Sequence, residues 1–207
     1  MRTEVRAPTL PFWQGRPGQL GLRFEPRTVL HWGMKCGVAL LALLAPMAGA
    51  QVIVSKTSPP RITTSANATA QESLAARELL VHLDQILGSK GRMEATATPA
   101  KNAIVVGLAS KWMPDAQLGE EDVLLRTRDG KLYVLGGGPR GVLYAVNRLL
   151  HRQGVRWWAP WATHIPKRGR IEFRGLDVVE RPKFESRDPF WFHAFDRDWA
   201  RRNGSNS

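Results

Sequence analysis

Three glycines with the spacing G-x-G-x-x-G lie in the stretch 134–150, which reads VLGGGPRGVLYAVNRLL. They are Gly136, Gly138 and Gly141, and they stand between a run that predicts a strand and a run that predicts an amphipathic helix. A loop of this kind can bind a pyrophosphate group at a helix N-terminus. Dinucleotide binding is therefore the first chemistry that the sequence offers.

The residues around this loop do not fit a dinucleotide site. Asp129-Gly130 lies between two alternating runs and predicts a tight hairpin, so the strand before the glycines belongs to a partly antiparallel sheet. A dinucleotide site also needs an acid about 20 residues further on, but the next acid after Asp129 is Glu172. We therefore predict a structural turn, in which Gly136 to Gly138 visit positive φ angles and let the chain reverse, while the small Gly141 lets the helix lie close to the sheet. Nucleotide binding by the glycines is kept as an alternative.

Two acidic clusters have the residue type that glycoside hydrolysis needs, which is a pair of carboxyl groups about 5–9.5 Å apart. Such clusters are typical of solvated surfaces and helix starts, and Asp196 suits a helix start. We therefore assign no catalytic residue. The clusters are Glu120, Glu121 and Asp122, and Asp188, Asp196 and Asp198.

Signatures of other sites do not occur in the sequence. There is no H-E-x-x-H, P-loop or G-x-S-x-G motif, and the histidines lack metal-ligand spacing. The single cysteine, Cys36, precedes the part of the chain that we expect to fold, so a disulfide or a cysteine nucleophile is not expected there. We expect no metal and no cofactor.

The charge of the chain is strongly positive, at +12 over 207 residues. Residues 51–207 contain 24 Lys and Arg against 16 Asp and Glu, which gives +8. These basic residues are scattered, without a dense run or an aromatic platform, so they favour a solvated basic surface or an acidic polysaccharide as partner over nucleic acid.

Residues 34–50 have the three-part layout of a secretory signal peptide. Lys35 precedes a short apolar run, and Ala48-Gly49-Ala50 forms a cleavage signature. The apolar run is shorter than the about 20 residues that span a membrane, so we predict export to the periplasm or the extracellular space and no stable membrane span. Residues 1–33 lack apolar periodicity, and we interpret them as a non-native extension upstream of a true start at Met34.

The remaining pattern predicts an α+β fold, with a mixed, largely antiparallel sheet and two main helices packed on it. The first helix begins at a capping box of Thr69 and Glu72 and ends near Gly88. The second helix runs from about residue 140 to 152, and a further helical segment follows Asp196. We expect strands at 51–56, 61–65, 102–110, 122–128, 131–135 and 155–158, and strand-like structure with turns over 170–192.

The stretch GGGPRGVLYAVNRLLHRQGVRWWAPWATHIPK resembles the N-terminal α+β domain that precedes the catalytic barrel in α-glucuronidases and β-hexosaminidases, including exported bacterial relatives. A G-[VI]-x-Y-[GA]-V core is matched by Gly141, Val142, Tyr144, Ala145 and Val146. The segments 75–88 and 102–110 resemble the first helix and the next strand of that domain. The resemblance covers about residues 52–187.

This resemblance implies an accessory domain at 51–180, followed at 181–207 by a linker and the first strand and helix of a truncated (β/α) barrel. The parent protein would be a glycoside hydrolase that binds carbohydrate through the missing barrel, with an acidic glycan as one option, and this chain alone would be inactive. A stand-alone exported glycan-binding module is the alternative, because the chain is basic and rich in tryptophan.

The resemblance also implies substrate-binding residues on the first barrel strand, namely Arg187, Trp191 and His193. A guanidinium group can pair with a uronate carboxylate through two N–H groups, and an indole ring can stack on a sugar. The alternative is that the tryptophans of this region fill a domain interface, because aromatic side chains dominate interface packing. Those tryptophans are Trp157, Trp158, Trp161 and Trp191.

Overall fold

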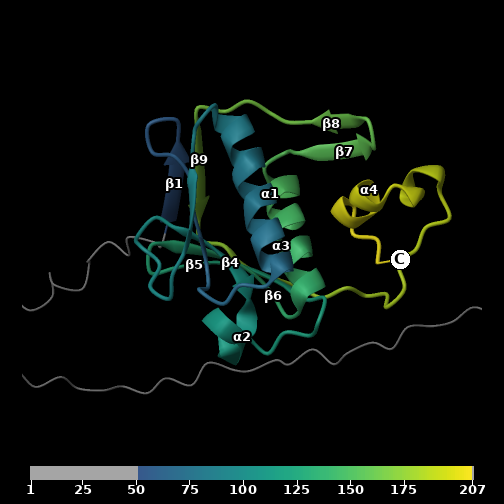
Figure 1. Cartoon of the computed structure of the whole chain (residues 1–207), viewed down its shortest axis with the longest axis horizontal. Helices are drawn as coiled ribbons and strands as arrows, with labels where there is room; N and C mark the ends of the chain where they lie inside the picture. The colour runs from purple at the N-terminus through teal and green to yellow at the C-terminus, as the bar shows by residue number, and fades with distance from the viewer. Residues whose placement is uncertain (1–50, 207) are drawn as a thin grey trace, which may run out of the picture. The chain divides into compact units, whose positions relative to one another are not determined.

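The computed structural model describes residues 51–206, which belong to one unit. The predicted extension at 1–33 and the predicted signal peptide at 34–50 lie outside the described residues. A mixed six-stranded sheet carries two long helices, as the α+β prediction expected (Figure 1).

The strands follow the predicted ranges closely, with two additions. The additions are β3 and β8, which the sequence pattern did not predict. The strands are β1 (Gln51–Ser55), β2 (Arg61–Thr64), β3 (Arg92–Ala95), β4 (Ile104–Leu108), β5 (Val123–Arg128), β6 (Lys131–Gly136), β7 (Arg156–Ala159), β8 (Ala162–His164), β9 (Arg170–Arg174) and β10 (Asp177–Glu180). The helices are α1 (Ala70–Leu87), α2 (Ala109–Trp112), α3 (Pro139–Arg152) and α4 (Arg197–Arg202), with short 3₁₀ turns η1 (Pro114–Ala116) and η2 (Phe192–Phe195).

The main sheet has the strand order β10-β5-β6-β4-β2-β3. Four neighbouring strands of this sheet are parallel to one another, namely β6, β4, β2 and β3. Strand β5 pairs antiparallel with β6, and β10 pairs antiparallel with β5. Two separate antiparallel pairs, β1 with β9 and β7 with β8, complete the described strands. The strand that follows α3 is β7, which does not return to the main sheet. The glycine turn between β6 and α3 is therefore not followed by the parallel strand that a dinucleotide site needs after its helix.

The start of α1 is fixed by the predicted capping box. Thr69 Oγ1 accepts a hydrogen bond from the Glu72 amide at 3.2 Å, and Glu72 Oε2 accepts one from the Thr69 amide at 2.7 Å. The same carboxylate accepts hydrogen bonds from the Leu108 amide at 3.0 Å and from Lys111 Nζ at 2.8 Å. Burial raises the pKa of Glu72, but these hydrogen bonds outweigh burial and lower it. One buried carboxylate thus joins the first turn of α1 to the end of β4.

The core lies between the main sheet and the helices α1 and α3. Alternate residues of β5 and β6, such as Val123, Leu125 and Val134, face this core, together with Val52 and Phe173 of the β1–β9 pair. The residues between them, Leu124 and Leu135, form a smaller cluster on the other face, which α2 covers. The alternation of the sequence therefore places apolar side chains on both faces of the central strands.

The three glycines lie at the connection between β6 and α3, where Gly136 ends the strand, Gly138 is the N-cap of the helix and Gly141 lies in its first turn, and none of them has the positive φ angle that was expected. The glycines with positive φ in the described residues are at 88, 130, 154, 175 and 204, so the turn glycines have ordinary backbone angles. A Cβ on Gly136 would overlap the backbone of Gly141 and Val142, and a Cβ on Gly138 would lie 2.9 Å from the Glu120 carbonyl oxygen. Glycine is needed here because β6, α3 and the loop at 119–122 meet backbone to backbone.

The amide groups of this turn are used inside the fold. The Gly137 amide donates to the Asp122 carbonyl at 3.1 Å, and the Gly138 amide donates to the Glu120 carbonyl at 2.7 Å. A phosphate-binding loop would need such N–H groups for its ligand. The nucleotide alternative therefore lacks both its topology and these two donors.

The strand predicted to contain Arg187, Trp191 and His193 is not formed. No neighbouring strand lies along this stretch within the described part of the chain, and an extended segment without a partner would leave its backbone groups unpaired. Local turns form instead, in which the Trp191 amide donates to the Pro189 carbonyl and the Ala194 amide to the Trp191 carbonyl, both at 2.8 Å. The helix predicted after Asp196 is present as α4, and Asp196 is its N-cap.

Replacing Gly136 by alanine should reduce the free energy of unfolding by about 3 kcal/mol, because the added methyl group overlaps backbone that cannot move aside. Gly169→Ala is the matched control, since nothing lies within 4 Å of its Cβ position, and it should change stability by less than about 0.5 kcal/mol. Urea denaturation of both variants measures the difference. Equal losses of unfolding free energy in the two variants would contradict a close backbone contact at Gly136.

Candidate functional site

Arg187 lies in the segment 181–206, which we call the C-terminal segment. Its Nη2 forms a short ion pair with the Glu121 carboxylate. Its Nε donates to the Gly204 carbonyl at 3.0 Å, and its Nη1 donates to the Phe184 carbonyl at 2.8 Å. The guanidinium group also lies over the Tyr144 ring, 5.4 Å from the centroid.

These contacts make Arg187 a clamp between the C-terminal segment, the loop at 119–122 and α3. All three of its guanidinium nitrogen atoms donate within the protein. Burial raises the pKa of Glu121, but the hydrogen bonds and charge of Arg187 outweigh burial and lower it. Substrate binding by Arg187 stays a prediction, and a substrate carboxylate would have to compete with Glu121 for the guanidinium group.

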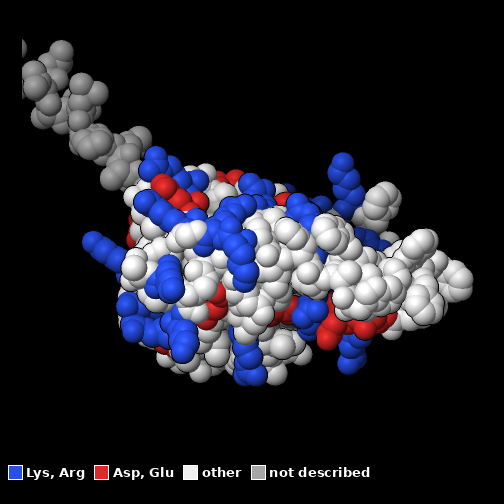
Figure 2. All heavy atoms as spheres, turned by 90° about the horizontal axis from the view of Figure 1, so that it is seen from above, with Lys and Arg blue, Asp and Glu red and all other residues white. Residues whose placement is uncertain are grey.

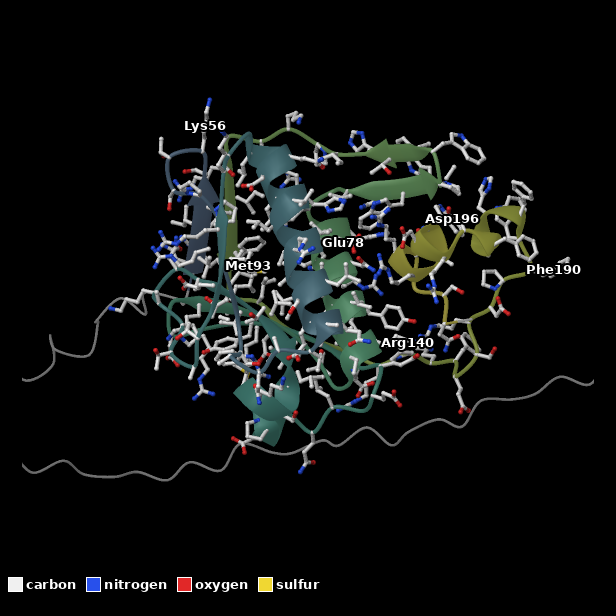
Figure 3. All side chains as sticks on the ribbon, in the orientation of Figure 1. Lys56, Glu78, Met93, Arg140, Phe190 and Asp196 are labelled. Atoms are coloured by element: carbon white, nitrogen blue, oxygen red, sulfur yellow. The ribbon has the colours of Figure 1, made fainter. Side chains whose placement is uncertain are left out.

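Further hydrogen bonds hold the C-terminal segment on the outer face of α3. Tyr144 Oη donates to the Ser205 carbonyl at 2.9 Å, and Asn147 Nδ2 donates to the Arg201 carbonyl at 3.2 Å. Beyond α3, the buried Glu78 of α1, labelled in Figure 3, accepts hydrogen bonds from the Arg201 and Arg202 side chains. The segment is therefore held by polar contacts along much of its length.

A pocket of about 260 Å³ remains between α3 and the C-terminal segment. Two carboxylates line it, Glu121 and Glu180, and each is paired with an arginine; Glu180 lies 2.5 Å from Arg148 Nε. The lowered pKa of Glu121 keeps this group ionised at neutral pH, so it is suited to holding a cation rather than to donating a proton. The arrangement can bind a small polar group, and Glu121 is not suited to be the protonated carboxyl group of a glycosidase.

Trp191 and His193 lie away from this pocket and belong to a group of aromatic rings. The His193 ring is 4.9 Å from Trp161 and 5.8 Å from Trp199, measured between centroids, and both contacts are edge-to-face. Trp191 and Phe192 contact the same ring at 6.0 and 5.9 Å. The structure thus brings Trp191 and His193 together but separates them from Arg187, and sugar binding by the pair stays a prediction.

The rings around His193 are part of an exposed apolar area at one end of the unit. We call it the aromatic surface. Phe190, labelled in Figure 3, is 97% exposed and points away from the fold, and this end is mainly white in Figure 2. The run FWF at 190–192 was the sequence signal for this surface. Its members are Trp158, Trp161, Phe190, Trp191, Phe192 and Phe195.

No group of three or more His, Cys, Asp or Glu side chains in residues 51–206 could hold a metal ion. No helix in the same range is long and apolar enough to cross a membrane.

No protein-family model and no curated protein matches this sequence. Among solved structures, a family GH115 4-O-methyl-α-glucuronidase with specificity for decorated arabinogalactans is similar, with a TM-score of 0.52 and 19% identity. The likeness covers 65% of this chain and 19% of that chain. A GH20 exo-β-N-acetylglucosaminidase from Vibrio harveyi has a TM-score of 0.41 at 16% identity, covering 66% of this chain and 18% of its own. A GH138 enzyme targeting pectin rhamnogalacturonan II has a TM-score of 0.34 at 17% identity, covering 45% of this chain and 10% of its own.

The first of these likenesses assigns the fold. Described residues of this chain adopt a fold that also occurs within a glycoside hydrolase, and the chain spans about a fifth of that enzyme's length. The other two have TM-scores below 0.5 and add no weight. The resemblance seen in the sequence is thus supported as a glycoside-hydrolase-like fold.

Replacing Glu121 by glutamine should reduce the free energy of unfolding by about 1 kcal/mol at neutral pH, because the clamp to Arg187 loses its ionic partner. A carboxyl group with a lowered folded-state pKa stabilises the fold above its unfolded pKa of about 4.3, and this contribution is lost as the pH falls through the folded-state pKa. The difference between wild type and variant should therefore vanish in acid.

Urea denaturation at low ionic strength, at pH 7 and in acid below the folded-state pKa of Glu121, measures both differences, because urea does not screen the ion pair. Asp198→Asn is the control, because this exposed carboxylate also pairs with an arginine, Arg201, but contributes little in water. A Glu121→Gln deficit that stayed constant between the two conditions would contradict an ionic clamp.

Proposed function

We propose that this chain provides a non-catalytic accessory domain of an exported carbohydrate-active protein, a glycoside hydrolase of α-glucuronidase-like organisation. The observation that carries the proposal is the likeness to the GH115 enzyme, which covers 65% of this chain but 19% of that one. A fold that forms about a fifth of a large glycosidase is suited to support or position a separate catalytic part. The proposal of export rests on the signal-peptide layout of residues 34–50.

The chemistry of the pocket supports a non-catalytic role. Retaining and inverting glycosidases both use one carboxyl group that is protonated when the bond breaks. Glu121 instead pairs with Arg187 and has a lowered pKa, and Glu180 pairs with Arg148. Two carboxylates held by arginines favour a structural network over acid–base catalysis.

The aromatic surface supports an association with another domain. Contiguous exposed apolar areas on soluble proteins commonly mark interaction sites. Phe190, Phe192 and Phe195 are 97%, 75% and 74% exposed, so they contribute little to the core of this unit. We propose that the catalytic part of the same protein covers them.

The alternative is a stand-alone exported glycan-binding module, and one observation favours it. Trp158 of β7 and Trp161 of the β7–β8 turn are 65% and 73% exposed, so the ring surface that each leaves open can stack on a sugar ring. Under this alternative, replacing both tryptophans by alanine would abolish binding to a neutral polysaccharide such as arabinoxylan. Under the accessory-domain proposal, the wild-type chain does not bind this polysaccharide measurably.

A panel of chromogenic aryl glycosides, including glucuronides and N-acetylglucosaminides, tests the absence of catalysis. The full chain should release no more aglycone than buffer does, because both carboxylates of its pocket pair with arginines. Turnover by the wild-type chain that falls at least about a hundredfold in Glu121→Gln would overturn the non-catalytic assignment.

Sedimentation velocity of the isolated full chain tests the interface. An uncovered aromatic surface should cause concentration-dependent self-association, and serine at Phe190, Phe192 and Phe195 should abolish it without lowering the melting temperature. The control carries serine at Leu74, Val81 and Val179, which are exposed elsewhere by 41%, 46% and 43%, and it should associate like wild type. A large fall in melting temperature for the phenylalanine variant would place these rings in the folded core instead.

A further inference from the structure

A basic groove of about 330 Å³ lies on the β1–β9 side of the unit, away from the aromatic surface. Figure 2 shows Lys and Arg side chains gathered over this end, whereas the end that carries the aromatic surface is mainly white. Four cationic side chains line the groove, and none of its lining residues is acidic. They are Arg61, Lys90, Arg92 and Lys101.

Three loops form the groove, and backbone contacts hold them in place. The Arg92 amide donates to the Pro60 carbonyl at 2.9 Å, which ties the start of β3 to the loop after β1. The Asn102 side chain donates to the Ile53 carbonyl at 2.7 Å and accepts from the Ile53 amide at 2.8 Å. The groove is therefore part of the folded scaffold and does not depend on the positions of flexible side chains alone.

The positive charge of the groove is largely uncompensated. Arg92 has a distant partner in Glu94 at 3.9 Å, whereas no ion pair involves Arg61, Lys90 or Lys101 in the described part of the chain. The nearby Asp84 carboxylate accepts hydrogen bonds from Ser89 Oγ at 2.6 Å and from the Gly91 amide at 2.9 Å, so it faces the loop that it holds. The pocket beside Arg187 differs, because its carboxylates pair with arginines.

We propose that this groove binds the carboxylate groups of an acidic polysaccharide, a polyuronate chain. The four cationic side chains can form charge-assisted hydrogen bonds with the repeated carboxylates of such a chain. The hydroxyl groups of Thr57 and Ser58, which also line the groove, can form hydrogen bonds with sugar hydroxyl groups. The assignment rests on the proposed carbohydrate-related function and adds a substrate class and a site to it. Binding here would hold the polymer on the accessory domain while a separate part of the protein acts on it.

A polysaccharide fits the groove better than a nucleic acid does. Proteins that bind single strands combine a basic path with aromatic rings on which the bases stack. The residues that line the groove include no aromatic side chain, and the exposed rings of the aromatic surface belong to other elements. The groove therefore offers charge and hydrogen bonds, which a polyuronate can use without stacking.

Affinity electrophoresis of the full chain in gels that contain polygalacturonate tests the groove. The wild-type chain should be retarded at low ionic strength and should migrate freely in gels that contain neutral dextran. The double variant Lys90→Gln, Lys101→Gln should bind polygalacturonate about tenfold more weakly, which corresponds to the loss of two charge-assisted contacts. Both side chains are exposed, so the variant should keep the wild-type melting temperature.

The matched control is Lys183→Gln, Arg197→Gln, which removes the same charge from exposed side chains of the C-terminal segment. It should bind polygalacturonate like wild type. If both double variants bound polygalacturonate equally weakly, net charge alone would explain the loss of binding, and this result would contradict a binding site in the groove. Absence of wild-type retardation, or tighter binding of an oligonucleotide or a sulfated dextran of matched charge, would overturn the polyuronate assignment. The glycoside assay and the self-association measurement are independent of these outcomes, so the groove can fail while the accessory-domain proposal stands.

Discussion

The close backbone contact at the glycine turn is the constraint on which the C-terminal half of the unit depends. Gly136 and Gly141 touch without side chains between them, and the amides of Gly137 and Gly138 bond to the loop at 119–122. That loop is thereby fixed against α3. Because it carries Glu121, its position also decides where Arg187 finds its carboxylate, and hence where the C-terminal segment lies. The motif that first indicated nucleotide chemistry therefore acts through packing.

The two ends of the unit differ in chemistry because different elements form them. Loops beside β1, β2 and β3 bring together cations without acids, whereas the β7–β8 pair and the residues after Pro189 expose aromatic rings. Between these ends, α1 and α3 pack on the sheet and keep the two surfaces apart (Figure 1). A unit built in this way can contact a protein domain at one end and a charged polymer at the other. The pocket beside Arg187 serves neither contact, because its carboxylates are paired internally.

Local signals in the sequence were sufficient for much of the fold. The capping box at Thr69, the stop at Gly88 and the turn at Asp129-Gly130 each fix backbone geometry within a few residues, and all three are present. The short strand β3 was missed because Met93 is 40% exposed and its neighbours are polar, so no apolar alternation marks it. The strand expected to carry Arg187, Trp191 and His193 was wrong, because the resemblance that implied it does not supply a neighbouring strand for it to pair with. The expectation of positive φ angles at the turn glycines was wrong. Glycine is needed there because the backbone of α3 and of the loop at 119–122 lies too close to leave room for a Cβ atom.

The candidate site could be predicted only in part, because the residues that contact one another there are far apart in the sequence. Sequence reasoning selected Arg187 but could not find its pairing with Glu121, which lies 66 residues earlier in the chain and occupies its guanidinium group. The basic groove likewise joins residues from three loops that no motif connects.

We propose that this chain binds an acidic polysaccharide through the groove and performs no hydrolysis. An NMR titration of the full, isotope-labelled chain with a galacturonate hexamer tests both parts in one sample. We expect amide shift changes confined to residues 57–61, 90–92 and 101–102, with the hexamer recovered intact. Shift changes centred on Arg187 and Tyr144, or cleavage of the hexamer, would contradict it.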